Sequence, residues 1–288
     1  MISSVAIVGG THGNETSGIQ LVRNWREYGL PHHYGSLSLS LHLANEAAIK
    51  ANTRFVEDDL NRQFSFERLL AADTSLEARL AKALNNTLGP KGDAKNDLVI
   101  DIHNTTSNMG ATLIILEADE FHISMARFVK KAMPEANILL EDEVTPAEHP
   151  YLCTVGKRGV MVEVGAQPQG VLREDVFQLA QTMTCAVLDF CQAWNEGTLD
   201  DLPECDAFRL GHNVLYPMDD NGNRKAMIHH QFQDADFLPL LPGSPVFRYF
   251  DGTDGVWEKE DVTYPHFINE AAYHKLNVAF ATSTAIKL

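Results

Sequence analysis

Hydrophobic and polar positions follow two alternating patterns along the first two thirds of the chain. Short apolar runs predict buried strands at residues 5–10, 98–103, 112–116 and 160–164, and alternation of Leu with Ser predicts a strand with one covered face at 36–43. Apolar residues that recur every three or four positions predict helices at residues 15–28, 75–88, 121–132 and 175–194. Strands that alternate with helices favour an α/β fold in which helices cover both faces of a sheet.

The pattern changes near residues 195–203, where the sequence Asn-Glu-Gly-Thr-Leu-Asp-Asp-Leu-Pro is typical of a linker. After it, short apolar runs are separated by Pro, Gly and Asp-Asn-Gly turns, and helical periodicity is weak. We therefore predict two domains, an α/β domain at residues 1–197 and a smaller β-rich domain at residues 198–288.

Composition excludes several classes of function. The chain has 288 residues and a net charge of −16, with no basic stripe, so we expect no nucleic-acid partner. No run of 18 apolar residues exists, so we expect no membrane span. The N-terminus lacks the charged and long apolar regions of a signal peptide. The four cysteines fit neither a zinc finger nor a disulfide framework, and a cytoplasmic location is the expectation.

The strongest chemical signal is Gly-Gly-Thr-His-Gly-Asn-Glu at residues 9–15, where the first predicted strand ends. His12 and Glu15 are three residues apart on a turn, so both can face one point beyond the carboxyl end of that strand. Imidazole and carboxylate groups both suit zinc. So short a pattern is, by itself, more typical of a solvated histidine and a glutamate that complements the helix dipole.

His103 adds a third candidate ligand at the end of the strand at residues 98–103. Asp101 precedes it by two positions and lies on the same face, where its carboxylate can accept the second ring N–H of a metal-bound histidine. The alternative is a polar strand end that caps a turn, but an aspartate in an apolar strand is costly without a partner. Two histidines and one glutamate leave a fourth coordination position, as expected of a hydrolytic zinc site.

Glu163 lies in the apolar strand at residues 160–164, with no local cation on its own face. A carboxylate with a raised pKa beside a metal site is suited to act as a general base. The alternative interpretation is a core glutamate paired with Lys157 or Arg158.

A charged patch at residues 54–62 offers cations for a substrate. Arg62 with Asn61 could clamp a carboxylate, and Arg54 could stabilise the oxyanion of a scissile carbonyl. By itself, such a run is more typical of a solvated loop.

Taken together and in order, these segments resemble the signatures of the aspartoacylase and aminoacylase III family. This family is the succinylglutamate desuccinylase/aspartoacylase branch of the zinc carboxypeptidase-like superfamily. The segments are His-Gly-Asn-Glu at 12–15, Asp-Leu-Asn-Arg at 59–62, Asp-Ile-His-Asn-Thr-Thr-Ser-Asn-Met-Gly at 101–110, Glu-Val-Gly-Ala-Gln-Pro-Gln-Gly at 163–170 and Tyr-Pro-His-Phe-Ile-Asn-Glu-Ala-Ala-Tyr at 264–273. The resemblance covers essentially the whole chain.

The resemblance implies a carboxypeptidase-like α/β/α sandwich and a smaller β-rich domain that shapes the substrate channel. It implies zinc-dependent hydrolysis of an N-acyl, most simply N-acetyl, L-amino acid to a carboxylate and the free amino acid. His12, Glu15 and His103 would bind one zinc per subunit, and Glu163 would activate water. The resemblance also implies that Arg54 stabilises the oxyanion and that Asp59 and Asp101 orient the metal ligands. The residues implied to bind the substrate are Asn61, Arg62, Asn104 and Tyr273. A homo-oligomer, dimer or tetramer, is a further expectation.

The chain departs from the pattern of family members specific for N-acetylaspartate at two places. Residues 151–156 lack the arginine expected upstream of the catalytic glutamate, and residues 276–277 replace an expected lysine. A buried substrate carboxylate without a partner would cost on the order of several kcal/mol, so we predict neutral or aromatic substrates. Three cations are candidates to take over the missing role: Lys157, Arg158 and Lys275. His149 and Tyr151 are candidates to line the pocket.

Other functions stay open at this point. An aspartoacylase proper would act on N-acetyl-L-aspartate, and a zinc carboxypeptidase with the same metal ligands would act on small peptides. A C-terminal domain that closes over the site would favour small substrates. A binding protein without chemistry would have a broken set of residues, but the whole set is present.

Overall fold

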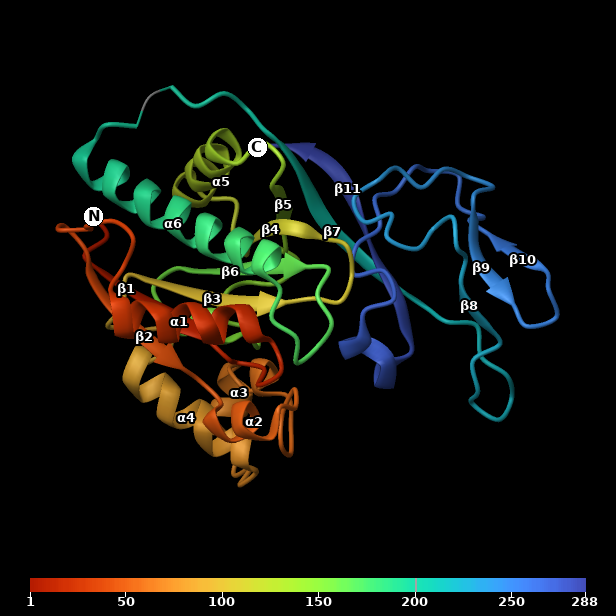
Figure 1. The fold of residues 1–288 in the computed structure, drawn as a ribbon, viewed down its shortest axis with the longest axis horizontal. Coiled ribbons are helices and arrows are strands. Elements are labelled where there is room, and N and C mark those ends of the chain that lie inside the picture. Colours follow the sequence, from red (N-terminus) through yellow and green to blue (C-terminus); the bar gives the residue numbers. More distant parts are fainter. Residues whose placement is uncertain (200) are drawn as a thin grey trace.

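The structure is a computed structural model that describes residues 1–199 and 201–288. Within these residues, a mixed sheet of eight strands has the order β11-β7-β5-β4-β6-β3-β1-β2 (Figure 1). The strands are β1 (Ser4–Gly9), β2 (Ser38–Leu43), β3 (Leu98–Asn104), β4 (Gly110–Ile115), β5 (Asn137–Leu140), β6 (Gly159–Gly165), β7 (Asp206–Leu215) and β11 (Val278–Lys287). The helices are α1 (Thr16–Tyr28), α2 (Glu46–Ala51), α3 (Phe66–Leu70), α4 (Leu76–Leu88), α5 (Glu120–Ala132) and α6 (Glu174–Glu196).

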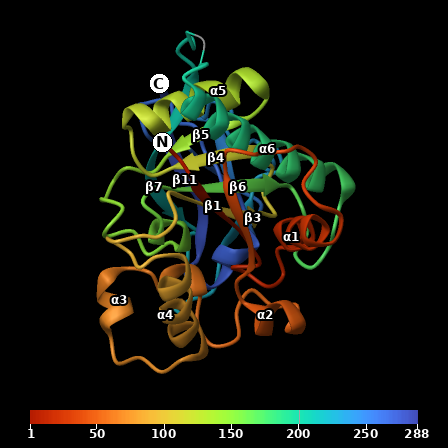
Figure 2. The same cartoon turned by 90° about the vertical axis from the view of Figure 1, so that its left-hand side faces the viewer.

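Alternate residues of the buried strands pack against different layers of helices. In β1, Val5 and Ile7 contact the cluster formed with α1, α5 and α6, whereas Ala6 and Val8 contact the cluster formed with α4. In Figure 1, α5 and α6 lie above the sheet and α2, α3 and α4 lie below it, and Figure 2 shows the same layers from the side. Two 3₁₀ helices, η1 (Leu60–Arg62) and η2 (Leu152–Val155), also cover the second face.

The predicted α/β/α layers are confirmed. Each predicted helix corresponds to α1, α4, α5 or α6, and each predicted strand to β1, β2, β3, β4 or β6, with ends shifted by at most two residues. The sequence pattern did not show β5, α2 or α3, because elements of four to six residues are too short for a period to emerge.

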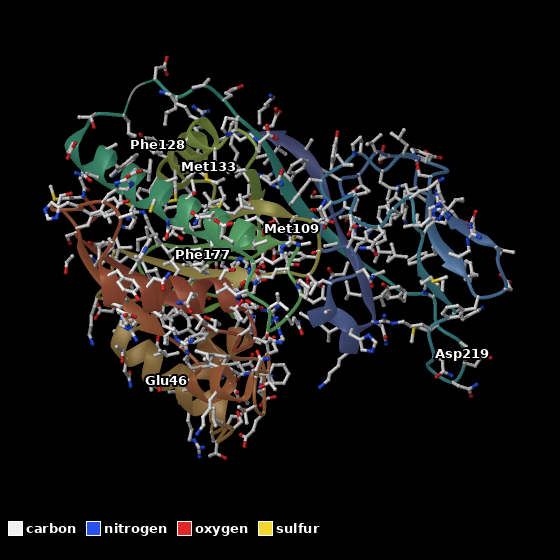
Figure 3. The ribbon with its side chains drawn as sticks, viewed as in Figure 1. Glu46, Met109, Phe128, Met133, Phe177 and Asp219 are labelled. Atoms are coloured by element: carbon white, nitrogen blue, oxygen red, sulfur yellow. The ribbon has the colours of Figure 1, made fainter. Side chains whose placement is uncertain are left out.

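The C-terminal part is β-rich, as predicted, and forms a lobe beside the main sheet. Its small sheet has the order β10-β9-β8, from β8 (Ala226–Ile228), β9 (Pro245–Tyr249) and β10 (Asp254–Val256). The aromatic residues Phe232, Trp257 and Phe280 form its core. In Figure 3, Asp219 lies at the far end of this lobe, and Met109 lies toward its junction with the main sheet.

The two parts of the chain share one sheet, a feature that the sequence pattern did not reveal. The antiparallel pair β7 and β11 comes from the C-terminal part, and β7 adds to the main sheet beside β5. A third 3₁₀ helix, η3 (Ala271–Leu276), precedes β11. Residue 200, inside the predicted linker, lies outside the described residues. Across the described chain, no helix is both long and apolar enough to cross a membrane.

Candidate active site

Three of the predicted ligands meet at the carboxyl ends of β1 and β3. The Nδ1 atoms of His12 and His103 are 3.2 Å apart. The carboxylate of Glu15 lies 2.7 Å from Nδ1 of His12 and 2.9 Å from Nδ1 of His103. All three side chains are buried, and their ligand atoms lie within 4.8 Å of one another. Because two facing ring nitrogens and a carboxylate all offer lone pairs, a cation between them would satisfy all three groups.

The outer nitrogen of each histidine contacts a carboxylate. His12 Nε2 lies 3.0 Å from Asp59 Oδ1, and His103 Nε2 lies 2.8 Å from Asp101 Oδ2. Thr11 donates a hydrogen bond of 2.7 Å to the second oxygen of Asp101. A carboxylate that accepts the Nε2–H holds the histidine in the tautomer whose Nδ1 lone pair is free for a metal ion. The donor set therefore fits a metal centre.

The charges around this cluster also favour a cation. Burial opposes ionisation of Glu15, but His12 and His103 hold its pKa well below the usual range through charge and hydrogen bonds. Burial would lower the pKa of His103, but the neighbouring Asp101 and Glu15 raise it well above the usual range. A divalent cation would neutralise the same negative charge.

Glu163 lies beside this cluster on the adjacent strand. The parallel register of β3 and β6 pairs His103 with Glu163, and only 8% of the Glu163 surface is exposed. Burial raises the pKa of Glu163 well above its usual range, and Glu15 and Glu270 add to the shift, whereas His103 and Arg54 oppose it. A buried carboxylate of this kind has a high affinity for a proton.

Arg54 is held between two carboxylates at the same end of the pocket. Its Nη1 lies 3.0 Å from Glu15 Oε1, and its Nη2 lies 3.0 Å from Asp59 Oδ2. These ion pairs fix the guanidinium beside the metal-ligand cluster, where it lines the pocket.

Asn61 and Arg62 lie in η1, whose first turn is capped by the carboxylate of Asp59. The side-chain oxygen of Asn61 accepts a hydrogen bond of 2.7 Å from the backbone of Leu152. The guanidinium of Arg62 lies 5.2 Å from the centre of the Tyr151 ring. Within the described residues no carboxylate forms an ion pair with Arg62, so its charge is available to a ligand.

Asn104 and Tyr273, the other predicted substrate-binding residues, both line the pocket. The amide nitrogen of Asn104 donates to Ser17 Oγ at 3.0 Å and to the Val164 carbonyl at 3.2 Å, and its oxygen accepts from the Ser17 backbone at 2.9 Å. These bonds tie β3 to α1 and β6. Tyr273 comes from η3 in the lobe and packs against the ring of Phe267.

Several pocket residues were not assigned a role from the sequence. Glu270 receives a hydrogen bond of 2.7 Å from the Thr106 backbone, and it also contacts the Thr105 hydroxyl. It thereby ties the lobe to the loop after β3. The sequence placed Glu270 within a motif, but gave no reason to single it out. Other residues that line the pocket and had no role assigned from the sequence include Ile114, Glu141, Met161, Phe267 and Ala272.

The three cations considered for a second substrate carboxylate lie elsewhere. Lys157 forms an ion pair of 2.8 Å with Asp97, and the guanidinium of Arg158 lies 4.5 Å from the centre of the Phe121 ring. The ammonium of Lys275 lies over the ring of Phe55. None of the three is among the described residues that line the pocket. In particular, Glu163 has neither Lys157 nor Arg158 as an ion-pair partner in the described chain.

Comparisons with known proteins identify the family. The model of the succinylglutamate desuccinylase/aspartoacylase catalytic domain matches residues 1–191, and that of the AstE/AspA barrel-sandwich hybrid domain matches residues 203–285. This chain belongs to the succinylglutamate desuccinylase/aspartoacylase family. The resemblance seen in the sequence is thereby confirmed, and the chain is an enzyme of the amidohydrolase and aspartoacylase type.

Relatives within the family carry two different names. A human N-acyl-aromatic-L-amino acid amidohydrolase (carboxylate-forming) is 41% identical over 282 residues, which cover 96% of this chain and 88% of that protein. An aspartoacylase from Danio rerio is 41% identical over 287 residues, which cover 97% of this chain and 90% of that protein. The crystal structure of murine aminoacylase 3 matches with a TM-score of 0.92 and 37% identity, covering all of this chain and 96% of that one.

Proposed function

We propose that this family member is a zinc-dependent amidohydrolase that cleaves N-acyl, most simply N-acetyl, L-amino acids to a carboxylate and the free amino acid. The observation that carries the proposal is the convergence of His12, Glu15 and His103 beside the buried carboxyl of Glu163. The names of the relatives support the same reaction.

Zinc is the metal we propose, held by Nδ1 of both histidines and by the carboxylate of Glu15. When bound, zinc would supply a Lewis acid that lowers the pKa of water and polarises a carbonyl. Asp59 and Asp101 would keep the two imidazoles in the metal-binding tautomer.

Glu163 would act as the general base and then as the general acid. Its carboxylate oxygen accepts a proton from the attacking water and later passes that proton to the nitrogen of the leaving amine. The raised pKa of Glu163 favours the first transfer. The N–H groups of Arg54 would stabilise the oxyanion that develops on the substrate carbonyl.

Arg62 and Asn61 would hold the α-carboxylate of the amino acid. Arg62 lines the pocket without an ion-pair partner in the described chain, and the Asn61 side chain is fixed by its bond to Leu152. Tyr273 would contact the substrate from the lobe. We propose that Asn104 positions α1 and β6 rather than the substrate, because its amide is already bonded within the protein.

We propose small substrates with neutral or aromatic side chains. Four lobe residues, Phe267, Glu270, Ala272 and Tyr273, line the pocket, and we expect them to disfavour peptides. Arg54 and Arg62 are the two arginine or lysine residues among the described pocket residues, and both have other roles. A second substrate carboxylate would therefore lack a cation.

The same proposal includes the division of the chain at residues 197 and 198, which the limits of the two family models support. It also includes a cytoplasmic location, which the four free cysteines support, and a homo-oligomer. Size-exclusion chromatography with light scattering tests the oligomer.

The decisive experiment compares initial rates of acetate release from N-acetyl-tyrosine and N-acetyl-aspartate on protein of measured metal content, with and without a chelator. We expect zinc near one per chain, loss of turnover with the chelator and faster turnover of N-acetyl-tyrosine. Faster turnover of N-acetyl-aspartate would contradict the substrate preference and leave the reaction intact. No turnover of either substrate by zinc-loaded protein would contradict the reaction.

A further inference from the structure

The far end of the pocket holds a carboxyl group that the proposed reaction does not use. Glu141 follows β5 directly, is only 5% exposed and lines the pocket. Its backbone N–H donates a hydrogen bond of 2.9 Å to the carbonyl of Ile115, which continues the pairing of β4 with β5. Burying a carboxyl group costs free energy unless a hydrogen-bond or ion-pair partner compensates.

The strand register places Glu141 at the end of the pocket away from Glu163, with Met161 and Ile114 forming an apolar floor between them. Met161 precedes Glu163 by two residues on β6 and therefore lies on the same face, about 7 Å back along the strand. Ile114 of β4 is the register partner of Met161. Both line the pocket, and Glu141 follows on the next strand beyond Ile114. A substrate whose amide lies at Glu163 would extend its side chain over Met161 and Ile114 toward Glu141.

Glu141 has fewer partners than Glu15 and Glu270, two other carboxyls of the pocket. Its Oε2 accepts one hydrogen bond, of 3.1 Å, from the hydroxyl of Tyr151. Among the described residues no cation forms an ion pair with it. By contrast, Glu15 pairs with Arg54 and both histidines, and Glu270 receives backbone N–H bonds. Part of the hydrogen-bonding capacity of Glu141 is therefore open to a ligand.

The surroundings hold this carboxyl in place. The ring of Tyr151 stacks on His149, with centroids 5.1 Å apart, and His149 Nε2 lies 3.0 Å from the backbone oxygen of Glu141. The three residues thus form a closed ring of contacts. These contacts therefore hold Glu141 in a defined position at this end of the pocket.

We propose that Glu141 determines which substrate side chains are accepted. It selects side chains that end in an N–H or O–H donor, such as an amide, a phenol or an indole, and it rejects side chains that end in a carboxylate. The apolar floor accommodates the stem of the side chain, and the donor at its tip completes the hydrogen bonding of Glu141. A carboxylate there would meet another carboxyl group, and Arg62, which lies over the Tyr151 ring, is assigned to the α-carboxylate of the substrate. This inference rests on the proposed function and deepens it.

Two pairs of substrates of matched shape test the inference. N-acetyl-asparagine ends in an amide that donates hydrogen bonds, where N-acetyl-aspartate ends in a charged carboxylate. N-acetyl-tyrosine and N-acetyl-phenylalanine differ in one hydroxyl. For the wild-type enzyme we expect kcat/KM to favour asparagine over aspartate by about 100-fold or more, and tyrosine over phenylalanine by about tenfold. Free L-asparagine should also inhibit more strongly than free L-aspartate.

The variant Glu141→Gln keeps the shape of the side chain and an acceptor for Tyr151 but removes the charge. We expect the asparagine-to-aspartate ratio to fall at least about tenfold, mainly through a lower KM for N-acetyl-aspartate. Glu135→Gln removes a charge at an exposed position before β5, and it should leave the ratio unchanged. Should Glu141→Gln not fold, the two inhibition constants of the wild-type enzyme test the same preference.

Two results would overturn the inference while the proposed function stands. One is a wild-type enzyme that hydrolyses N-acetyl-aspartate as well as N-acetyl-asparagine, and the other is an unchanged ratio in Glu141→Gln. If zinc-loaded protein hydrolyses no N-acyl amino acid at all, the proposed function fails and this inference falls with it.

Discussion

The metal-ligand residues and the far end of the pocket differ in how completely their polar groups are partnered. At the metal-ligand end, His12 and His103 use both ring nitrogens, and Glu15 contacts both histidines and Arg54. At the far end, Glu141 receives one hydrogen bond, from Tyr151. A saturated network holds groups rigidly for chemistry that every substrate shares. A group with free hydrogen-bonding capacity can instead bind the side chain of the substrate, which differs from one amino acid to the next.

The largest effect should come from removing one metal ligand. His103→Ala should reduce both the zinc content and the turnover to background, because the remaining two ligands cannot hold the ion tightly. Zinc analysis by mass spectrometry and acetate release measure the two effects. His33→Ala, at an exposed position, serves as the control. A metallated and active His103→Ala protein would remove His103 from the ligand set.

A smaller but still severe effect is expected at Glu163. Glu163→Gln should retain zinc and lower kcat by about 10²–10⁴-fold, because an amide cannot take a proton from water. Loss of turnover in a Glu163→Gln variant that keeps its full zinc content would separate proton transfer from metal binding at this end of the pocket. Turnover near the wild-type rate would reject the role of general base.

Arg62 lies between the two ends and should affect binding more than chemistry. Arg62→Ala should raise KM by about tenfold or more with a smaller change in kcat, because it removes the proposed partner of the substrate α-carboxylate. Steady-state kinetics measure both constants, and Arg68→Ala, at an exposed site on α3, is the control. A fall in kcat at unchanged KM would instead assign Arg62 to the transition state.

The smallest expected effect is the pH dependence of substrate preference that comes from Glu141 at the far end of the pocket. Burial, and then the nearby charge of Glu143, raise the pKa of Glu141 to about 7, whereas the Tyr151 hydrogen bond and Arg62 act in the opposite direction. Glu141 therefore gains its charge as the pH rises through about 7. The asparagine-to-aspartate ratio of kcat/KM should increase several-fold from about pH 6 to pH 8.

Taking a ratio cancels the pH dependence that Glu163 imposes on both substrates. His149 also lies near this end, and burial lowers its pKa, so its titration would act in the Glu141→Gln variant as well as in the wild-type enzyme. With Glu141 as the group responsible, the ratio of that variant should be flat with pH. A flat ratio in the wild-type enzyme would show that Glu141 does not change its charge in this range.

The sequence was informative where chemistry depends on short spacing. His12 and Glu15 are three residues apart and share a turn, and Asp101 and His103 are two apart and share a strand face. Such spacings fix relative direction before the fold is known. The α/β/α layers were predictable for the same reason, since most of their elements are long enough to show a period.

The far end could not be predicted, because it depends on tertiary placement. Glu141 follows a strand of only four residues, and nothing in the sequence shows that β5 lies next to β4. Likewise, Lys275 follows Tyr273 by two positions, but the turn of η3 sends it to Phe55 and away from the pocket. Side-chain direction in irregular segments does not follow from spacing alone.

The shared strand pair β7 and β11 limits how the lobe, which lines one part of the pocket, can move. The two strands are ten residues long and run from the lobe, where Phe280 belongs to the aromatic core, to the main sheet, where Phe208 pairs with Leu139. A hinge requires a few residues free of such ladders. Rigid-body opening of the lobe would shear the backbone hydrogen bonds of this pair, whose register shifts between Val278 and Phe280 and between Ala281 and Ser283. We therefore expect ligands to enter and leave by local movement of η3 and the loops around it.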